Sequence, residues 1–238
     1  MRLNHAIMDQ ESRRKKTAKI VRIVERRKSL EGARVLEIGT GSGVIAASLV
    51  EIVGTEGAVY ATDIKDQRVA TEGYEFQMVA DTTLPFEDGQ FDVVISNHVI
   101  EHVGDEADQL HHLTEIRRVM KPDGLLYLAV PNKWRIIEPH YRIPALSWLP
   151  KSAADFIVRL SGKNEQFDCK LLARRELRAL FRKTGFTHAE LDREVMKVVG
   201  EIEGSNTAMW LSRLPSGILW LMLLIVPTLV VVATKSAR

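Results

Sequence analysis

Apolar residues are distributed along this chain in two patterns, which together predict alternating strands and helices. Two segments, 44–53 and 108–120, carry apolar residues at helical spacing and are followed by stops that contain glycine. Short uninterrupted apolar runs have the composition of strands that are buried on both faces. These runs are residues 34–38, 58–62, 76–80, 91–96 and 125–130. Strands that alternate with helices predict an α/β domain, and 238 residues suffice for one such domain.

The junction between the first strand and the first helix is rich in glycine. Gly39, Gly41 and Gly43 alternate within residues 35–43. Glycine adopts backbone turns that side chains forbid, so a flat ligand can lie against this loop, and the N-terminus of the following helix points at that ligand. The G-x-G-x-G spacing differs from the G-x-G-x-x-G spacing that is typical of dinucleotide sites.

Acidic residues stand at the ends of the first three predicted strands. Glu37 lies two residues before the first glycine, while Asp63 and Asp81 follow the second and third strands. Three carboxylates that converge on one crevice would repel a diphosphate, but they suit a ligand with a ribose, an adenine amine and a positive charge. S-adenosylmethionine has these features, and a nicotinamide dinucleotide is disfavoured.

In chain order, these residues resemble the motifs of class I S-adenosylmethionine-dependent methyltransferases of the methyltransferase-11-like kind. The matching segments are residues 37–43, 63–64, 81, 91–97 and 113–131. The resemblance implies S-adenosylmethionine as the cofactor and a Rossmann-like seven-stranded sheet with helices on both faces. It says little about the methyl acceptor, although residues 133–141 resemble methyltransferases found with bacterial cell-surface glycan genes.

The resemblance implies a cofactor site at the carboxyl ends of the strands. Asp63 would accept hydrogen bonds from two ribose hydroxyls, and Ile64 would lie on the adenine face. Asp81 with Thr82 would bind the adenine amine edge. Asn97, at the end of the fourth strand, would face the methionine end of the cofactor. The expected cofactor-binding residues are Glu37, Gly39, Thr40, Gly41, Gly43, Asp63, Ile64, Asp81, Thr82 and Asn97.

Two histidines and a glutamate follow the fourth strand, at His98, Glu101 and His102. Their H-x-x-E-H pattern resembles that of a zinc protease, but the protease motif belongs on a long helix, so we reject that interpretation. Some quinone-pathway O-methyltransferases carry carboxylate and histidine metal ligands at this place, where His98 here replaces an acid. A divalent metal at these three residues is therefore an alternative, and we favour a role for Glu101 and His102 in orienting the loop.

An aromatic insertion at residues 132–170 follows the fifth strand. Its prolines prevent one long helix, and its place at the sheet edge predicts an acceptor pocket with a lid. An aromatic mini-core without a catalytic role is the alternative. If the acceptor is a hydroxyl group, the reaction needs a base, and histidine titrates near neutral pH. The predicted substrate-binding residues are Trp134, Glu138, Tyr141 and Trp148, and the predicted bases are His140, His98 and His102.

The C-terminal part predicts two more strands and two more helices. Residues 173–184 predict a basic amphipathic helix that ends at Gly185, and residues 186–191 predict the sixth strand. The apolar run 218–226 is followed by Pro227 and then by β-branched residues. Because proline disfavours one membrane-spanning helix, we expect a short apolar helix between the sixth and seventh strands, and then an antiparallel seventh strand as in the resembled fold.

The net charge and the single cysteine limit the kinds of partner and bond that we expect for this protein. The formal net charge is +2, which predicts no nucleic-acid partner, and one cysteine, Cys169, excludes an internal disulfide. Residues 1–30 predict a basic amphipathic helix that covers the cofactor crevice or lies on anionic lipid. Residues 31–238 predict the methyltransferase domain, which we expect in the cytoplasm because no secretory apolar run begins the chain.

The apolar segment 208–227 exceeds what a connection between two strands can bury, so we expect it to bind a membrane surface and make the enzyme peripheral or monotopic. The predicted function is methyl transfer from S-adenosylmethionine, by O-methylation, to a membrane-resident or lipid-linked small acceptor. A glycolipid, a polyprenyl-linked sugar and a quinone-like phenol are the acceptor classes. The alternative is a non-catalytic, membrane-bound scaffold that binds S-adenosylmethionine.

Overall fold

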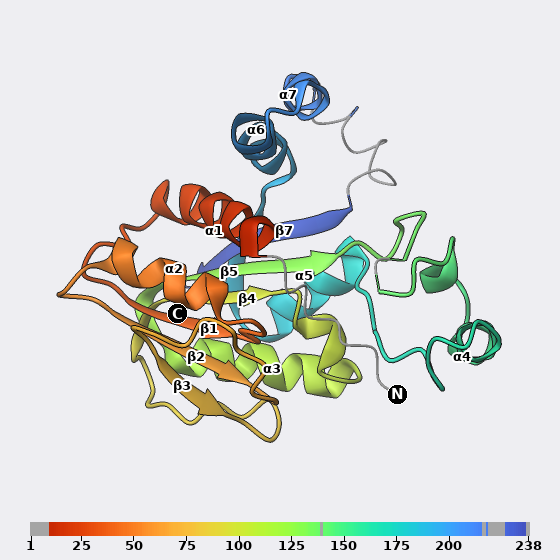
Figure 1. The fold of residues 1–238 in the computed structure, drawn as a ribbon, viewed down its shortest axis with the longest axis horizontal. Coiled ribbons are helices and arrows are strands. Elements are labelled where there is room, and N and C mark those ends of the chain that lie inside the picture. Colours follow the sequence, from red (N-terminus) through yellow and green to blue (C-terminus); the bar gives the residue numbers. More distant parts are fainter. Residues whose placement is uncertain (1–9, 139, 216–217, 219–226, 237–238) are drawn as a thin grey trace.

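The computed structural model contains one seven-stranded sheet with the order β3-β2-β1-β4-β5-β7-β6 (Figure 1). The structure describes residues 10–138, 140–215, 218 and 227–236. Neighbouring strands from β3 to β5 pair in parallel, whereas β7 is antiparallel to both β5 and β6, as the sequence predicts. The strands are β1 (Arg34–Ile38), β2 (Ala58–Asp63), β3 (Glu75–Met78), β4 (Phe91–Asn97), β5 (Met120–Pro131), β6 (Phe186–Glu190) and β7 (Thr228–Lys235).

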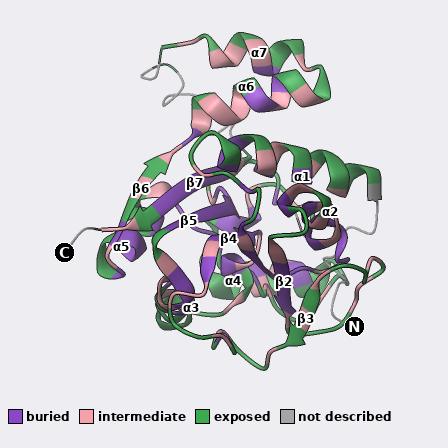
Figure 2. Ribbon diagram, turned by 90° about the vertical axis from the view of Figure 1, so that its left-hand side faces the viewer, coloured by how far each residue is buried: buried purple, intermediate pink, exposed green. Residues whose placement is uncertain are grey.

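Helices cover both faces of this sheet, which confirms the predicted Rossmann-like α/β class. Helices α1, α2 and α6 contribute to one apolar core, and α3 and α5 contribute to the core on the opposite face. The central strands are therefore buried from both sides (Figure 2). The helices are α1 (Gln10–Glu25), α2 (Val44–Val53), α3 (Glu106–Val119), α4 (Lys151–Leu160), α5 (Arg174–Lys183), α6 (Asp192–Glu203) and α7 (Asn206–Ser212), with short 3-10 turns η1 (Ile100–His102) and η2 (Leu146–Trp148).

The predicted N-terminal helix, α1, is part of the core. Its apolar residues Ile20, Ile23 and Val24 are almost fully buried and pack in the same core as α2. Lys19 of this helix lies 2.5 Å from Glu203 of α6, and Arg27, two residues beyond the end of α1, lies 2.6 Å from Glu194 of α6. Ion pairs therefore join α1 and the turn that follows it to the neighbouring helix.

The alternation of strands and helices, with a connection this short, predicts a helix of about two turns between β2 and β3. Residues 64–74 form an irregular loop instead. The amides of Val69 and Ala70 in this loop donate hydrogen bonds to Ser42 O, at 2.9 and 3.1 Å. A Cβ atom on Gly43, whose φ is +77°, would lie 2.1 Å from Ala70 O. Contact with the glycine loop therefore replaces helical hydrogen bonding in this connection.

The segment between β6 and β7 contains α6, which stands next to α1, and α7, which packs on the outer side of α6 (Figure 1). The apolar helix predicted at 218–226 lies outside the described residues apart from Ile218, which is exposed. Among the helices that the structure describes, none combines the length and the apolar character needed to cross a membrane.

We expect Gly43→Ala to destabilise the fold more than Gly204→Ala. Both glycines have a left-handed backbone, with φ values of +77° and +68°, but nothing lies within 4 Å of a Cβ placed on Gly204. The Gly204 substitution isolates the backbone strain of about 1 kcal/mol. The Gly43 substitution adds a backbone clash worth about 1–3 kcal/mol. Urea denaturation of both variants measures the difference, and equal losses would show that residues 64–74 do not press on the glycine loop.

Candidate active site

The glycine loop joins the ends of β1 and β2 through three successive backbone amides. The amides of Gly39 and Thr40 donate to Thr62 O, at 2.8 and 3.1 Å, and the amide of Gly41 donates to Asp63 Oδ2 at 2.8 Å. The φ angles of the three glycines are +71°, +55° and +77°, values that L side chains rarely adopt. The loop is thereby fixed beside the end of β2, where the sequence predicts the ribose site.

Glu37 is a buried carboxylate beneath this loop. It is 2% exposed, and its Oε2 accepts a hydrogen bond of 2.7 Å from Thr40 Oγ1. Burial raises the pKa of Glu37 to about 7, although the Thr40 hydroxyl and the charge of Arg13 act in the opposite direction. Glu37 can therefore hold or release a proton near neutral pH, and a positive ligand charge would favour the ionised form.

Asp63 and Ile64 stand at the end of β2 in positions that fit a ribose and an adenine ring. Besides the amide of Gly41, the carboxylate of Asp63 accepts the amide of Lys65, at 3.2 Å. An ionised carboxylate has about four acceptor positions, so two remain for hydroxyl groups. Ile64 is 61% exposed beside it and offers an apolar face to a flat ring.

Asp81 and Thr82 lie in the loop beyond β3, because this strand ends at Met78 rather than at the predicted residue 80. Asp81 Oδ1 accepts the amide of Thr83 at 2.7 Å, and this hydrogen bond lowers the pKa of Asp81. The hydroxyl of Thr82 lies 2.6 Å from Nδ1 of His111 on α3. The loop is thus held to α3 while the exposed Asp81 carboxylate keeps acceptor positions for an amine.

Two cations of α1 lie close to the acidic crevice, as expected of a helix that covers it. Arg13 acts on the charge of Glu37, and Lys16 is affected by both Glu37 and Glu101. Burial, with Arg13 and Lys19 nearby, lowers the pKa of Lys16 to about 8. The sequence prediction did not include Arg13 or Lys16 in the site, and their spacing of one helical turn is the signal that places them on a common face.

His98 directly follows β4, and the turn η1 brings Glu101 next to it. His98 has an unusual φ of +60°, and its Nδ1 lies 3.4 Å from Oε1 of the fully buried Glu101. Burial lowers the pKa of His98, which therefore carries a neutral, basic imidazole at pH 7. Burial alone would raise the pKa of Glu101, but the contact with His98 and the charge of His102 hold it below its usual value.

Asn97 lies immediately before this turn, at the end of β4. It is 9% exposed, and in the sheet it stands opposite Ala129 of β5. The amide of His98 donates to Ala129 O at 2.9 Å, which fixes the backbone after Asn97. Asn97 therefore occupies the strand-end position from which the sequence expects it to face the cofactor.

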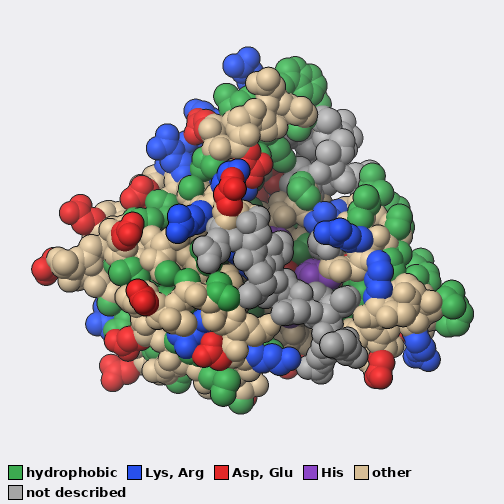
Figure 3. Space-filling model, viewed as in Figure 1, with side chains coloured by type: hydrophobic (Ala, Val, Ile, Leu, Met, Phe, Trp, Pro, Cys, Tyr) green, Lys and Arg blue, Asp and Glu red, His purple; other side chains and the backbone are tan. Residues whose placement is uncertain are grey.

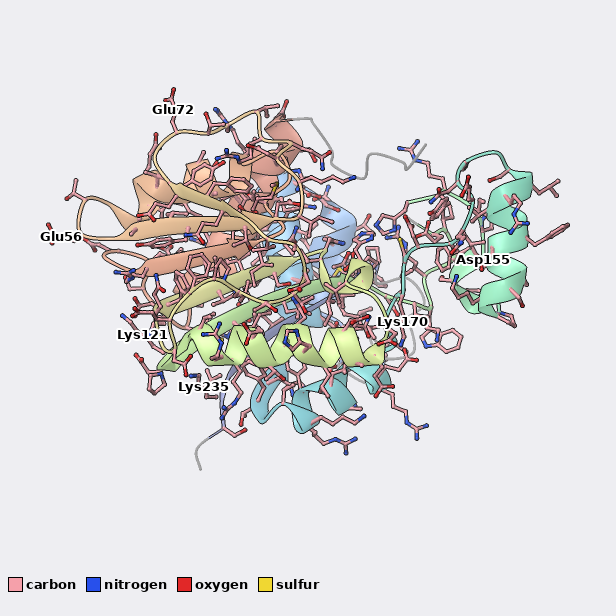
Figure 4. All side chains as sticks on the ribbon, turned by 90° about the horizontal axis from the view of Figure 1, so that it is seen from below. Glu56, Glu72, Lys121, Asp155, Lys170 and Lys235 are labelled. Carbon is pink, nitrogen blue, oxygen red and sulfur yellow. The ribbon has the colours of Figure 1, made fainter. Side chains whose placement is uncertain are left out.

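Two of the four predicted substrate-binding residues are buried within the insertion. Glu138 and Tyr141 are 0% exposed, and the Tyr141 hydroxyl donates to Asp168 Oδ1 at 2.6 Å. Tyr141 belongs to the small core of the insertion, and Glu138 accepts the backbone amides of His140 and Tyr141. A role in binding the acceptor stays a prediction for both. Trp134 and Trp148 are 47% and 43% exposed and stay available to an acceptor. Figure 4 shows the helix that carries Asp155 standing apart from the sheet.

The remaining predicted histidines meet where η1 contacts the insertion. The rings of His102 and His140 pack edge to face with their centres 4.8 Å apart, and Cys169 Sγ lies 3.5 Å from His102 Nδ1. His140 Nδ1 is 2.7 Å from Oε1 of Glu138. His98 does not belong to this cluster. No local pattern predicts that Cys169 lies beside His102, because the two residues are 67 positions apart in the chain.

Comparison with known proteins identifies the class. A family model described as a methyltransferase domain matches residues 8–191. The chain therefore belongs to the methyltransferase-domain family, and the expected class of protein is confirmed.

A ubiquinone biosynthesis O-methyltransferase of Cereibacter sphaeroides is 28% identical over 138 residues, 53% of each chain. A demethylmenaquinone methyltransferase of Chlorobaculum tepidum is 31% identical over 146 residues, 58% of this chain and 59% of that one. This chain thus spans just over half the length of these relatives.

Solved structures share the fold. An S-adenosylmethionine-dependent methyltransferase from Aquifex aeolicus superposes with a TM-score of 0.53 at 18% identity, over 78% of this chain and 93% of that one. The phosphoethanolamine N-methyltransferase 2 of Haemonchus contortus, in complex with S-adenosyl-L-methionine, gives a TM-score of 0.56 at 16% identity, over 91% of this chain and 52% of that one. At these identities the likeness shows the fold.

We expect Glu37→Gln to change how stability depends on pH. The folded pKa of Glu37, about 7, lies above its ordinary value of 4.5, so the native state binds an extra proton between these pH values. The stability from this group is complete below about pH 4.5 and is lost as pH rises towards 7, by on the order of 1–3 kcal/mol. Urea denaturation from pH 5 to 8 should show that loss in the parent chain and a flatter profile in Glu37→Gln. Parallel profiles would contradict the buried, protonated carboxylate.

Proposed function

We propose that this chain transfers a methyl group from S-adenosylmethionine to a hydroxyl oxygen of a small, lipid-linked acceptor. A quinone-like phenol is the first acceptor class, and a polyprenyl-linked sugar or a glycolipid is the next. The observation that carries the proposal is the glycine loop fixed to Asp63 above the buried Glu37, with His98 at the neighbouring strand end. The names of the two relatives, a ubiquinone biosynthesis O-methyltransferase and a demethylmenaquinone methyltransferase, support a quinone-like acceptor, and the first also supports transfer to oxygen.

The residues present fit the cofactor, whose sulfonium supplies an electrophilic methyl group when it is bound. Asp63 offers acceptors to ribose hydroxyls, and Ile64 offers an apolar face to adenine. Arg13 and Lys16 supply positive charge for the carboxylate of the methionine end. Glu37 offers negative charge near the sulfonium. Because such a methyl group is already reactive, the protein mainly has to hold the acceptor oxygen close and in line.

His98 is the base that the geometry favours over His140. Its partly buried imidazole is neutral at pH 7, and Glu101, 3.4 Å away, stabilises the imidazolium that forms when His98 takes the hydroxyl proton. The oxygen then forms its bond to the methyl carbon as the carbon–sulfur bond breaks. His140 and His102 lie with Cys169 where η1 meets the insertion, so we rank them after His98.

Asp63→Ala should weaken binding of S-adenosylmethionine by about 1–3 kcal/mol, because two ribose hydroxyls lose their acceptor. Asp63→Asn is the matched control, since its amide oxygen still accepts the amide of Gly41 and holds the loop in place. Calorimetry measures both variants against the parent chain. Unchanged affinity in Asp63→Ala, with the protein folded by circular dichroism, would contradict the assigned ribose site.

Turnover distinguishes an enzyme from a scaffold that only binds the cofactor. The parent chain, given S-adenosylmethionine labelled in its methyl group and a membrane lipid extract, should place label in an O-methyl group found by mass spectrometry. His98→Gln should lower the rate by about 10²–10⁴-fold while cofactor affinity stays within a few fold. Tight cofactor binding without transfer to any extract would favour the scaffold.

We further propose that the insertion rests on an anionic membrane surface that supplies the acceptor. Residues 132–170 carry seven lysines and arginines against four acidic residues. On α4, Phe156 and Leu160 are 63% and 77% exposed while Ala154 and Val158 are buried, so one face of the helix is apolar and open. Figure 3 shows hydrophobic and basic side chains together on this side of the molecule. This combination is typical of helices that lie in a lipid interface.

The double variant Phe156→Ser with Leu160→Ser should bind vesicles of anionic lipid at least about tenfold more weakly, because each large apolar side chain contributes roughly 1.5–3 kcal/mol when fully buried. The control carries Val69→Ser with Met78→Ser, two exposed apolar residues at the β3 end of the sheet. Vesicle flotation compares the two. Equal binding would place the contact elsewhere, and Trp220→Ser with Leu223→Ser then tests the apolar segment.

A further inference from the structure

The contact between η1 and the insertion gathers three side chains whose atoms are metal ligands. His102, His140 and Cys169 each offer one ligand atom, and these atoms all lie within 4.8 Å of one another. No other group of three potential ligands of this kind is found in the described part of the chain. His102 comes from the methyltransferase core, whereas His140 and Cys169 come from the two ends of the insertion. The proposed methyl transfer does not use these three side chains.

The orientation of His140 is fixed by a buried carboxylate. Oε1 of Glu138 lies 2.7 Å from His140 Nδ1, and its Oε2 accepts the backbone amides of His140 and Tyr141 at 2.8 and 2.6 Å. A histidine that donates from one ring nitrogen to a carboxylate presents the other nitrogen as a ligand, and metal-binding histidines almost always have such a partner. Glu138 thus has the place and the geometry of the residue that supports a metal ligand.

The charge around the cluster is negative. Asp168 Oδ1 lies 3.4 Å from Cys169 Sγ, and Glu101 and Glu138 are both fully buried. Apart from the 3.4 Å contact of its Oε1 with His98 Nδ1, the carboxylate of Glu101 has no hydrogen-bond partner among the described residues. Negative groups gathered around a thiol disfavour its thiolate form unless a cation is bound there. A divalent cation would offset this repulsion and supply a favourable charge to each carboxylate.

We propose that His102, His140 and Cys169 bind a zinc ion at the junction of η1 with the insertion. Two imidazoles and one thiolate form a ligand set that zinc favours, whereas magnesium and calcium prefer oxygen ligands. In a tetrahedral zinc site with these bond lengths, ligand atoms lie about 3.3–3.7 Å apart. The Cys169–His102 separation of 3.5 Å already has this value. The three ligand atoms all lie within 4.8 Å of one another, so shifts of about 1 Å would bring every pair to this spacing.

This zinc ion would connect the insertion to the core. The insertion has its own small core, and backbone hydrogen bonds from the amides of Asn132, Lys133 and Lys170 hold its ends to Pro227, Leu172 and Glu101. Metal bonds that join His102 to His140 would add a link away from these ends. Three protein ligands leave one position of a tetrahedral zinc ion for water or another oxygen, as in many zinc sites with exchangeable ligands.

Cobalt substitution tests the ligand set directly. The purified full chain is stripped with a chelator and titrated with Co²⁺ in the absence of S-adenosylmethionine. We expect one equivalent to bind, with a thiolate-to-cobalt charge-transfer band and the intense visible bands of four-coordinate cobalt. Cys169→Ser should remove the charge-transfer band, and His102→Gln, at an exposed position, should lower zinc stoichiometry without unfolding the chain. Glu138→Gln should weaken zinc binding about 10–100-fold.

His188→Gln is the matched control, because His188 lies on β6 and stacks on Phe181, away from the cluster. It should bind zinc and cobalt as the parent chain does. A parent chain without the charge-transfer band, or a band that persists in Cys169→Ser, would overturn the proposal. Equal zinc stoichiometry in His102→Gln and His188→Gln would overturn it as well. These readouts need no cofactor or acceptor, so they are independent of the proposed methyl transfer.

Discussion

The hydrogen bonds between the glycine loop and the end of β2 are the constraint on which the rest of the site depends. They fix the positions of Asp63 and Gly41 relative to one another, and the same loop covers the carboxylate of Glu37. Since β1 and β2 are parallel neighbours, their ends open on the same edge of the sheet. A backbone that reaches left-handed φ at three positions is required to make this connection.

The acidic character of this edge explains several neighbouring features. A buried Glu37 and the carboxylates that follow it would repel one another without nearby positive charge. Helix α1 brings Arg13 and Lys16 to them, while its Lys19 pairs with Glu203 of α6. The helix therefore divides its charge between the crevice and a neighbouring helix. A positively charged cofactor would offset negative charge of these carboxylates that Arg13 and Lys16 leave unmatched.

The sheet could be predicted from sequence because its strands are buried on both faces and appear as uninterrupted apolar runs. The connection at 64–74 could not, because hydrogen bonds to Ser42 replace those of a helix, and such contacts leave no periodic pattern. The placement of the glycine loop and of the acidic residues could also be predicted. Each follows a predicted strand, and the carboxyl ends of parallel strands meet at the same edge of the sheet.

The insertion shows the limit of sequence reasoning most clearly. Glu138 and Tyr141 have the residue types of a binding pocket, and the sequence does not show that both are buried inside the insertion, where Tyr141 donates a hydrogen bond to Asp168. The pairing of His102 with Cys169 joins residues 67 positions apart and has no local signature. Both features are contacts between residues that are far apart in the chain, and the segment after α4 supplies one partner of each.

We infer that this edge of the sheet binds a positively charged adenosyl ligand rather than a diphosphate. Calorimetric titration of the full chain with S-adenosylmethionine and, separately, with NAD tests this inference most directly. We expect one S-adenosylmethionine to bind per chain and NAD to give no measurable heat. Binding of NAD, or no binding of S-adenosylmethionine by a folded chain, would contradict it.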